Sequence, residues 1–355
     1  MVKYLKGLDT LRAIAALIVV WGHIELLKKN KGMVNLIDNE YFNLPSGHIA
    51  VILFFVLSGF LITFLLVKER EKVGKISLKK FFIRRILRIW PLYYLILFLS
   101  FLLFNADYSQ KTVLLCLSGF PNIAHALKAG WPTSPHVWSI GVEEQFYLFW
   151  PILLSLIPIK RIILTLSLFI IGYTILPHVI CFINIRTFQN FEFNSFINEL
   201  FYGTKFNCMS VGALVGFLYA RQHKWLKVIS NKFVAYSSII LSVLLWTFGL
   251  EFNYFTDEFY SVLFVIAIYN IVVNPKINID TKATSFLGKI SFGIYMYHWI
   301  IIMLTLKYLP ISKNDILYNV CLYLAVLIGT IFISWISFNS VEKYFLNIKK
   351  QFETT

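Results

Sequence analysis

Long apolar segments, separated by shorter polar stretches, run through almost the whole chain. Ten of them have the ~17–25 residues that a helix needs to cross the hydrocarbon core of a bilayer, once the short ones are extended into neighbouring residues. They cover residues 8–27, 48–67, 90–105, 143–158, 162–180, 204–220, 233–250, 258–274, 289–308 and 316–340. The pattern therefore predicts an all-α integral membrane protein, a bundle of about ten transmembrane helices.

Another apolar piece, residues 112–120, is too short to cross a membrane and is soon followed by Pro121, Pro132 and Pro135. Counting it as a span would invert every later loop and place most of the downstream basic residues outside. We therefore assign residues 106–142 to an outer segment that is a candidate re-entrant loop, because irregular backbone at membrane depth is tolerated where protein or water satisfies it.

Basic residues cluster in alternate loops between the apolar segments. The main clusters lie within residues 68–88, 221–232, 276–289 and 343–350. Because cytoplasmic loops carry an excess of Lys and Arg, this bias predicts a multi-pass protein of the cytoplasmic (inner) membrane with both termini in the cytoplasm. We expect one transmembrane domain over residues 1–340, a short cytoplasmic tail over residues 341–355, and no soluble second domain.

The composition narrows the classes of function. Hydrophobic residues make up 58% of the 355-residue chain and charged residues only 14%, whereas soluble globular proteins carry about 25% charged residues. The formal net charge of +15 follows from the loop bias, so we expect membrane lipid, and no nucleic acid, as a partner. The four cysteines lie far apart without a C-x-x-C pair, so neither a metal site nor a disulfide framework is expected.

The first apolar segment contains ionisable residues, which are expensive at membrane depth and mark functional sites. They are Asp9, Arg12 and His23. Eleven residues separate Arg12 from His23, which is about 20° past three helical turns and ~17 Å along the axis. Both side chains are therefore expected on one face, one near the inner and one toward the outer end. The alternative is that Arg12 snorkels to lipid head groups and that His23 is simply hydrogen-bonded in the bundle.

The most charged loop ends in a pair of arginines before the third span. Arg85 and Arg88 are three residues apart, so on a helix they share a face. Two guanidinium groups on one face suit a phosphate-bearing ligand, because each binds oxygens bidentately. The alternative is that the cluster fixes topology or contacts anionic lipid.

Two adjacent carboxylates open the fourth span, in the stretch HVWSIGVEEQFYLFWP of residues 136–151. Glu143 and Glu144 lead into an aromatic, apolar run, so one of them is expected to face the bundle interior. There it would orient or charge a histidine. The alternative is a pair of solvated groups at the membrane interface.

Other polar residues lie inside the predicted spans. His298 in FGIYMYHWI is a secondary candidate, because a histidine in this position more often bonds a neighbouring backbone. Ser58 and Gly59 in VLSGFLIT are typical of close helix packing.

Five stretches in this order closely resemble the membrane-bound acyltransferase-3 family. They are LDTLRAIAALIVVWGH, FFVLSGFLIT, RRILRIWPLYY, VWSIGVEEQFYLFWP and SFGIYMYHW. Arg12-x10-His23, Arg85-x-x-Arg88 and Ser139-x-x-x-Glu143 match the family's hallmark motifs. The resemblance implies an integral-membrane O-acyltransferase that takes an acyl group, expected to be acetyl, from cytoplasmic acetyl-CoA and passes it to a hydroxyl of an outward-facing cell-envelope carbohydrate. Some relatives add a soluble esterase-like domain. None is expected here, so the bundle or a separate partner would complete the transfer.

The motifs and the resemblance together predict roles for the donor-binding residues. Arg85 and Arg88 would hold the phosphates of the acyl-CoA, with Arg12 nearer the thioester. His23 would either deprotonate the acceptor hydroxyl or itself take the acyl group.

The remaining site residues would orient the catalytic histidine or contact the acceptor. Glu143 would orient His23 and stabilise its cation, with Glu144 as the alternative carboxylate. His136, Trp138 and Ser139 would help to form the acceptor site, since aromatic faces suit the apolar faces of sugars. The sequence leaves the acceptor open among O-antigen, capsule, exopolysaccharide, peptidoglycan and a small glycoside.

Two other classes of function stay open at this point. One is a proton-coupled transporter or lipid-linked sugar flippase that uses His23 and Glu143 as a proton relay. Transporters often show repeats with interrupted helices in matching positions, and no such pair is evident. The other is a structural membrane scaffold, which would not require Arg, His and Glu side chains facing inward.

Overall fold

The computed structural model describes residues 5–38, 45–252, 255–309 and 316–353, and over these residues its regular elements are all helices. The chain divides into two compact units. Unit 1 comprises residues 1–54, 87–96 and 228–351, and unit 2 comprises residues 55–86, 97–227 and 352–355. Two long helices, α2 (Gly47–Val73) and α3 (Leu78–Leu103), contribute to both units.

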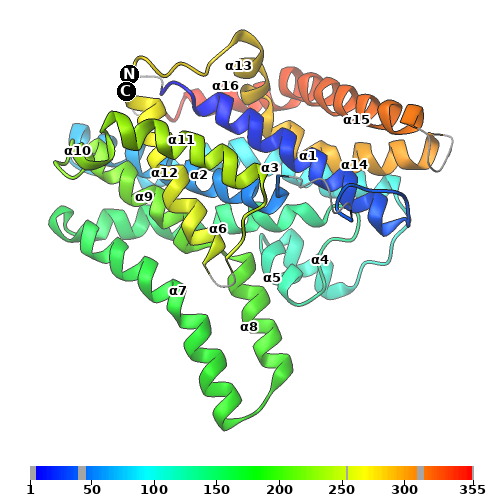
Figure 1. Ribbon diagram of the computed structural model, residues 1–355, viewed down its shortest axis with the longest axis horizontal. Helices are drawn as coiled ribbons and strands as arrows, with labels where there is room; N and C mark the ends of the chain where they lie inside the picture. The colour runs from blue at the N-terminus through cyan, green and yellow to red at the C-terminus, as the bar shows by residue number, and fades with distance from the viewer. Residues whose placement is uncertain (1–4, 39–44, 253–254, 310–315, 354–355) are drawn as a thin grey trace. The chain divides into compact units, whose positions relative to one another are not determined.

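Unit 1 is built around the first helix, α1. Its other whole helical elements are α11, α12, α13, α14, α15, η3 and α16. Their bounds are α1 (Leu8–Asn30), α11 (Lys232–Thr247), α12 (Thr256–Val273), α13 (Lys282–Lys289), α14 (Ser291–Tyr308), α15 (Ile316–Ser337), η3 (Phe338–Glu342) and α16 (Lys343–Lys350). Helix α1 packs against α13 and α14, α14 against α15, and α11 against α12 (Figure 1). Small and branched side chains of α1, α14 and α15, among them Ala16, Ile294 and Leu322, form the buried core between these helices.

Polar contacts fix the start of α1. Asp280, just before α13, accepts hydrogen bonds from the Gly7 amide (2.8 Å) and from the Thr10 hydroxyl (2.7 Å). Gly288 of α13 lies so close to α1 that a Cβ there would be 2.2 Å from the Asp9 carbonyl oxygen. The backbone that carries Asp9 and Arg12 is therefore held against α13.

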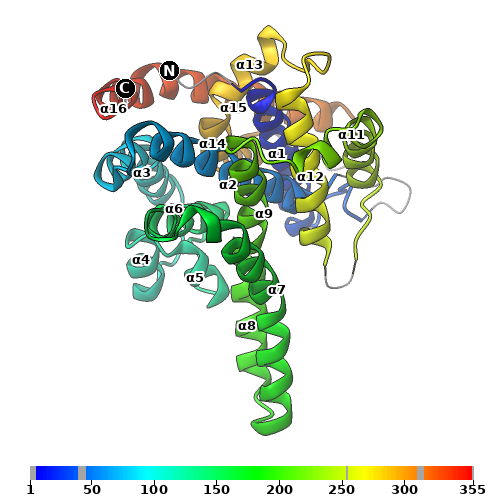
Figure 2. The same ribbon diagram turned by 90° about the vertical axis from the view of Figure 1, so that its left-hand side faces the viewer.

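Unit 2 contains the middle of the chain. Its elements are α4 (Gln110–Leu117), α5 (Pro121–Ala126), η1 (Pro135–Val137), α6 (Trp138–Leu156), η2 (Ile159–Arg161), α7 (Ile162–Thr187), α8 (Phe191–Gly203) and α9 (Phe206–Ala220). The short helix α10 (Leu226–Ile229) lies at the boundary with unit 1. Helices α7 and α8 run antiparallel, side by side (Figures 1 and 2).

Helices α2 and α9 approach each other through glycine. A Cβ on Gly59 would lie 1.9 Å from the Met209 carbonyl oxygen, and one on Gly212 would lie 2.1 Å from that of Val56. The close packing predicted at Ser58–Gly59 is thus confirmed, and it depends on the absence of a side chain at both glycines.

Six described helices are long and apolar enough to cross a membrane. They lie in residues 8–30, 47–73, 78–103, 159–187, 256–273 and 316–350, and the pair α13–α14, bent by 70°, is a seventh if it counts as one span. Each of the ten predicted segments overlaps a helix, but α9 and α11 have only 15 and 16 residues. The structure therefore supports a multi-pass membrane protein with six or seven candidate spans. Exposed apolar side chains such as Leu164, Leu168 and Phe182 cover α7.

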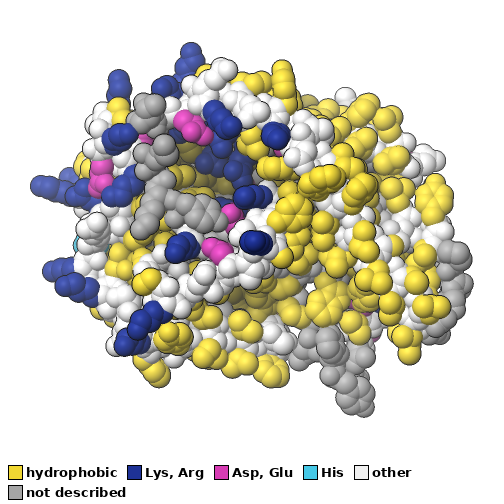
Figure 3. Space-filling model, turned by 90° about the horizontal axis from the view of Figure 1, so that it is seen from above, with side chains coloured by type: hydrophobic (Ala, Val, Ile, Leu, Met, Phe, Trp, Pro, Cys, Tyr) yellow, Lys and Arg dark blue, Asp and Glu magenta, His cyan; other side chains and the backbone are white. Residues whose placement is uncertain are grey.

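Several helices differ in extent from the apolar segments that predicted them. Helix α3 begins at Leu78, before Arg85 and Arg88, and α7 continues to Thr187. Helix α8 was not predicted; it begins after Asn190, whose side chain accepts a hydrogen bond from the Phe193 amide. Residues 106–142, which were predicted to form an outer segment, contain the short helices α4 and α5. On the face shown in Figure 3, Lys and Arg side chains gather toward one side and hydrophobic side chains cover much of the rest.

Candidate active site

In unit 1, His23 of α1 is paired with a second histidine from α14. Its Nδ1 lies 2.7 Å from Nε2 of His298, and the two rings are stacked with centroids 5.0 Å apart. Trp299 contacts the His23 ring edge-on at 4.9 Å. His298 is fully buried, and its Nδ1 lies 2.6 Å from the carbonyl oxygen of Tyr295. His23 is therefore held by a chain of contacts that starts at the α14 backbone.

These contacts favour one tautomer of each ring when both rings are neutral. A carbonyl oxygen only accepts, so Nδ1 of His298 must donate to Tyr295. His298 is buried, where an added charge is expensive, so we assign it as neutral and its Nε2 as an acceptor. His23 then donates from Nδ1, and its lone pair lies on Nε2. The arrangement makes Nε2 of His23 the basic and nucleophilic atom of the pair.

Arg12 lies on the same continuous helix as His23. Helix α1 is unbroken from Leu8 to Asn30, so the helical spacing that underlies the predicted shared face is present. The Arg12 guanidinium is half-buried and lies 3.1 Å from the Asp9 carboxylate, one turn earlier.

In unit 2, Glu143 lies at the centre of a polar cluster. It accepts hydrogen bonds from the Ser58 hydroxyl (2.9 Å) and the Tyr147 hydroxyl (3.1 Å). The guanidinium of Arg85 lies between two aromatic rings, 5.4 Å from the centroid of Phe81 and 5.3 Å from that of Tyr147. Arg85 and Glu143 are thus brought to the same tyrosine.

The neighbouring arginines have different surroundings. Arg84 donates a hydrogen bond to the Phe352 carbonyl oxygen (2.8 Å), and its guanidinium lies 3.4 Å from the Glu69 carboxylate, so both contacts are within the protein. Arg88, in unit 1, is exposed and interacts electrostatically with the buried Glu342. Glu342 closes η3, a π-helical turn that extends α15.

The predicted acceptor residues lie where α6 begins. His136 is buried in η1, and Ser139 donates to its carbonyl oxygen at 3.2 Å. The Trp138 ring stacks with His125 at 6.0 Å and meets Phe55 edge-on at 6.2 Å. Burial lowers the pKa of His125. These side chains therefore form part of a packed layer at the start of the helix.

The predicted residues divide between the units. Arg12, His23, Arg88 and the secondary candidate His298 belong to unit 1. The other predicted site residues belong to unit 2: Arg85, His136, Trp138, Ser139, Glu143 and Glu144. The pairing of Glu143 with His23, with the half-buried Glu144 as its alternative, joins the two units and stays a prediction.

Several residues that contact the predicted site residues were not predicted from the sequence. Tyr147 lies one helical turn after Glu143, and this spacing was the only feature of the sequence that could have pointed to it. Ser58 was interpreted as a packing residue, and His298 as a secondary candidate. Within the described ranges, no group of three or more His, Cys, Asp and Glu side chains could hold a metal ion.

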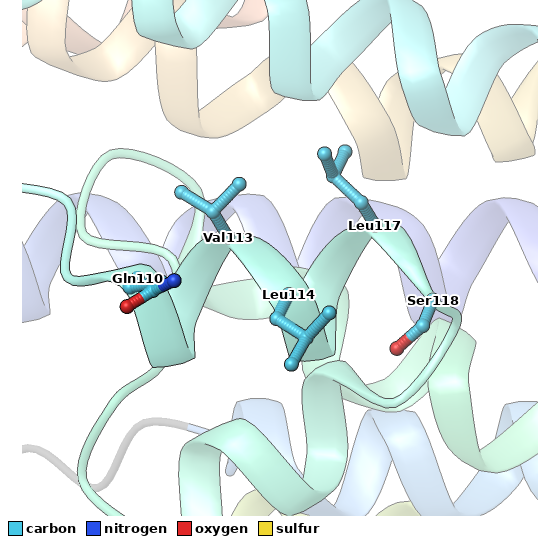
Figure 4. A pocket seen from close by; sticks show the side chains of 5 residues that line it. All are labelled: Gln110, Val113, Leu114, Leu117 and Ser118. Carbon is cyan, nitrogen blue, oxygen red and sulfur yellow. The ribbon is translucent and has the colours of Figure 1, made fainter.

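An open apolar depression of about 630 Å³ runs along α4. Figure 4 shows Val113 and Leu117 projecting to the same side of this helix, with Gln110, Leu114 and Ser118 completing the lining. None of the predicted site residues lines it, so it is separate from the clusters around His23 and Glu143.

Comparison with known proteins addresses the resemblance directly. A family model described as an acyltransferase domain, that of the acyltransferase-3 family, matches residues 5–338. The chain belongs to this family. The resemblance drawn from the sequence motifs is thereby confirmed.

Three curated relatives of this chain carry O-acetyltransferase names. "Peptidoglycan O-acetyltransferase OatA" of Listeria monocytogenes is 27% identical over 96% of this chain and 55% of its own length. "Putative peptidoglycan O-acetyltransferase YrhL" of Bacillus subtilis is 26% identical over 96% and 55%. "Putative O-acetyltransferase SACOL0978" of Staphylococcus aureus is 27% identical over 86% and 52%. The chain thus spans about half the length of the curated relatives it matches. No solved structure matches.

Proposed function

We propose that the protein transfers an acyl group, expected to be acetyl, from cytoplasmic acetyl-CoA to a hydroxyl of an outward-facing cell-envelope carbohydrate. Family membership over residues 5–338 supports an acyl transfer. The names of the relatives support acetyl as the group, and two of them support peptidoglycan as the acceptor. The observation that carries the proposal is the His23–His298 pair, because it supplies a basic nitrogen inside an apolar helix packing.

The donor phosphates are proposed to bind Arg85 and Arg88. Both residues lie on α3, three positions apart, whereas Arg84 of the same cluster is bonded to Glu69 and the Phe352 carbonyl. Arg12, further into the first span, would approach the thioester end of the donor.

The chemistry is proposed to occur at Nε2 of His23. This atom either removes the proton from the acceptor hydroxyl while the hydroxyl oxygen attacks the thioester carbon, or attacks that carbon itself and carries the acyl group to the acceptor. Glu143 would stabilise the His23 cation, with Glu144 as the alternative, and His136, Trp138 and Ser139 would contribute to the acceptor site.

The proposal includes a topology. It has ten spans in the cytoplasmic membrane, both termini in the cytoplasm, and residues 106–142 as an outer, re-entrant segment. Residues 1–340 would form one transmembrane domain and residues 341–355 a cytoplasmic tail. Donor and acceptor would then reach the site from opposite sides.

The experiment uses the full chain purified into lipid nanodiscs. Acetyl-CoA binding is measured by calorimetry, and transfer of labelled acetyl to isolated cell-envelope glycan is measured for wild type, His23→Ala and, as a matched control, His223→Ala. We expect His23→Ala to bind acetyl-CoA but not to transfer the label, and His223→Ala to behave as wild type. Near-normal transfer by His23→Ala would remove His23 from catalysis. Absence of acetyl-CoA binding by wild type would instead favour the transporter or flippase, or the structural scaffold.

A further inference from the structure

Unit 1 contains a second histidine that is held by a partner from another helix, and none of the predicted motifs includes it. His48, in the first turn of α2, lies 3.0 Å by its Nε2 from both carboxylate oxygens of Asp257, in the first turn of α12. The His48 side chain is 20% exposed and that of Asp257 is 7% exposed. The His48 side chain is thus partly exposed, while the carboxylate that holds it is buried.

The first turn of α2 is anchored from two helices. Trp246 of α11 donates its indole N–H to the Ser46 carbonyl oxygen at 3.0 Å, and Asp257 holds His48 from α12. A carboxylate in the first turn of a helix is favoured by the helix dipole, so Asp257 is stabilised as an anion where it stands.

This anchored turn packs against α1 beside His23. A Cβ on Gly22 would lie only 3.7 Å from the backbone N and Cα of Gly47. His23 and His48 are the next residues along their helices. Further along α2, Phe54 meets Tyr295 edge-on at 5.9 Å, and Tyr295 provides the carbonyl that holds His298. The His48–Asp257 pair therefore belongs to the same region of unit 1 as the His23–His298 pair.

The two pairs present different nitrogen atoms. A carboxylate only accepts, so Nε2 of His48 carries the hydrogen and the lone pair of the neutral ring lies on Nδ1. A histidine oriented by a buried carboxylate is the arrangement of a general base. His23, held by a neutral imidazole, has its lone pair on Nε2 instead.

We propose that the two histidines divide the reaction, with His23 carrying the acyl group and His48, oriented by Asp257, accepting the proton of the acceptor hydroxyl. This rests on the proposed function. In the first step Nε2 of His23 bonds to the acyl carbon, and the thioester C–S bond breaks with the electron pair leaving on the CoA sulfur. In the second step the acceptor oxygen bonds to that carbon, the C–N bond breaks and its electron pair returns to Nε2. The acceptor proton passes to Nδ1 of His48 and then to water.

The test separates the two steps. His48→Gln keeps an N–H that can bond Asp257 but has no basic nitrogen, so it preserves a structural link and removes the base. Wild type, His48→Gln, His48→Ala and the control His223→Gln are purified as full chains in nanodiscs. Rapid-quench kinetics follow CoA release with labelled acetyl-CoA, and transfer to isolated envelope glycan is measured separately.

We expect His48→Gln to release about one CoA per protein in a burst and then to transfer at least about a hundredfold more slowly than wild type. Free imidazole should partly restore transfer by His48→Ala. Two results would overturn the inference. One is a transfer rate of His48→Gln within threefold of wild type, and the other is loss of both the CoA burst and transfer in this variant. Either would show that the His48–Asp257 contact only links α2 to α12. If wild type neither releases CoA nor transfers the acetyl group, the proposed function itself is overturned. If wild type turns over and His48→Gln transfers at the wild-type rate, only the division of roles between His23 and His48 is overturned.

Discussion

His23 and His298 share a hydrogen bond of 2.7 Å between Nδ1 and Nε2, and the second ring is anchored in turn to the carbonyl oxygen of Tyr295. The two residues are 275 positions apart in the chain. In the proposed mechanism, this neutral imidazole would do the orienting that a carboxylate performs in a Ser-His-Asp triad. Because His298 is fully buried, a neutral partner avoids the desolvation penalty of an additional ion.

The first prediction concerns the tautomer of His23. His298→Ala removes the acceptor of the Nδ1–H bond, so neutral His23 will populate both tautomers and only a part will carry its lone pair on Nε2. We expect the rate of acetyl transfer to fall between about tenfold and a thousandfold, since a wrong tautomer in a triad lowers kcat by about 10⁴. Acetyl-CoA affinity should stay within twofold of wild type.

The tautomer itself is measurable in the same protein. Nitrogen NMR of histidine-labelled samples, with the His23 signal assigned by its loss in His23→Ala, distinguishes Nδ1–H from Nε2–H. Wild type should show Nδ1–H at His23, and His298→Ala a mixture. If a folded His298→Ala protein transfers acetyl at an unchanged rate, the His23–His298 contact serves packing only.

The second prediction concerns donor binding by α3. Loss of one hydrogen-bonding partner of a charged group weakens binding by about 1.5–3 kcal/mol, or roughly ten- to a hundredfold. The Arg85→Ala, Arg88→Ala variant should therefore bind acetyl-CoA at least tenfold more weakly in calorimetry, and lysine at both positions should restore binding only in part.

A matched control removes the same charge from the same helix. Lys79 and Lys80 are exposed residues of α3, and their replacement by alanine should leave acetyl-CoA affinity nearly unchanged. If both double variants lower the affinity for acetyl-CoA equally, the arginines contribute only general electrostatic attraction.

The order of the helices was predictable from the sequence, but their ends were not. Apolar length determines where a helix can cross a membrane, and each predicted segment does overlap a helix. Helix ends depend on local caps and tertiary packing, so α3 begins at Leu78 among charged residues and α8 begins after the Asn190 cap. The pattern of apolar residues alone predicts neither of these two helix starts.

The candidate site was predictable only where a residue was unusual for its own segment. Arg12 and His23 stand out because they are ionisable inside a span, and the acyltransferase-3 motifs draw attention to the same positions. His298 was only a secondary candidate and His48 was not singled out, because the contacts that distinguish them come from distant helices. His48 and Asp257 are 209 residues apart, and no spacing rule relates them.

The third prediction tests the contact between α2 and α9. Gly59→Ala places a methyl group against backbone atoms of α9 that cannot move independently, so the helices must separate. Overpacking of this kind lowers stability by about 1–3 kcal/mol. We expect a lower thermal midpoint in nanodiscs, together with reduced transfer, because the adjacent Ser58 is bonded to Glu143. Gly172→Ala is the control, since a Cβ at that helical position meets no other atom within 4 Å. Equal midpoints for the two variants would contradict this packing.

The fourth prediction concerns the sidedness of the reaction, which requires residues 106–142 outside and the α2–α3 turn inside. His136 is buried, so a cysteine there would report poorly. The exposed positions Gln110 and Lys79 are better probes. Cysteines are introduced at each position after replacement of Cys181 and Cys321.

The two remaining cysteines give a low background in this experiment. Cys116 and Cys208 are buried, and burial raises the pKa of the Cys116 thiol to about 11, so little thiolate is present at neutral pH. An impermeant thiol reagent is added to intact cells without their outer barrier. It should label position 110, and it should label position 79 only after the membrane is opened. Labelling of both in detergent provides the control for reactivity. The reverse pattern in intact cells would invert the topology, place Arg85 and Arg88 on the outer side, and exclude a cytoplasmic donor at these arginines.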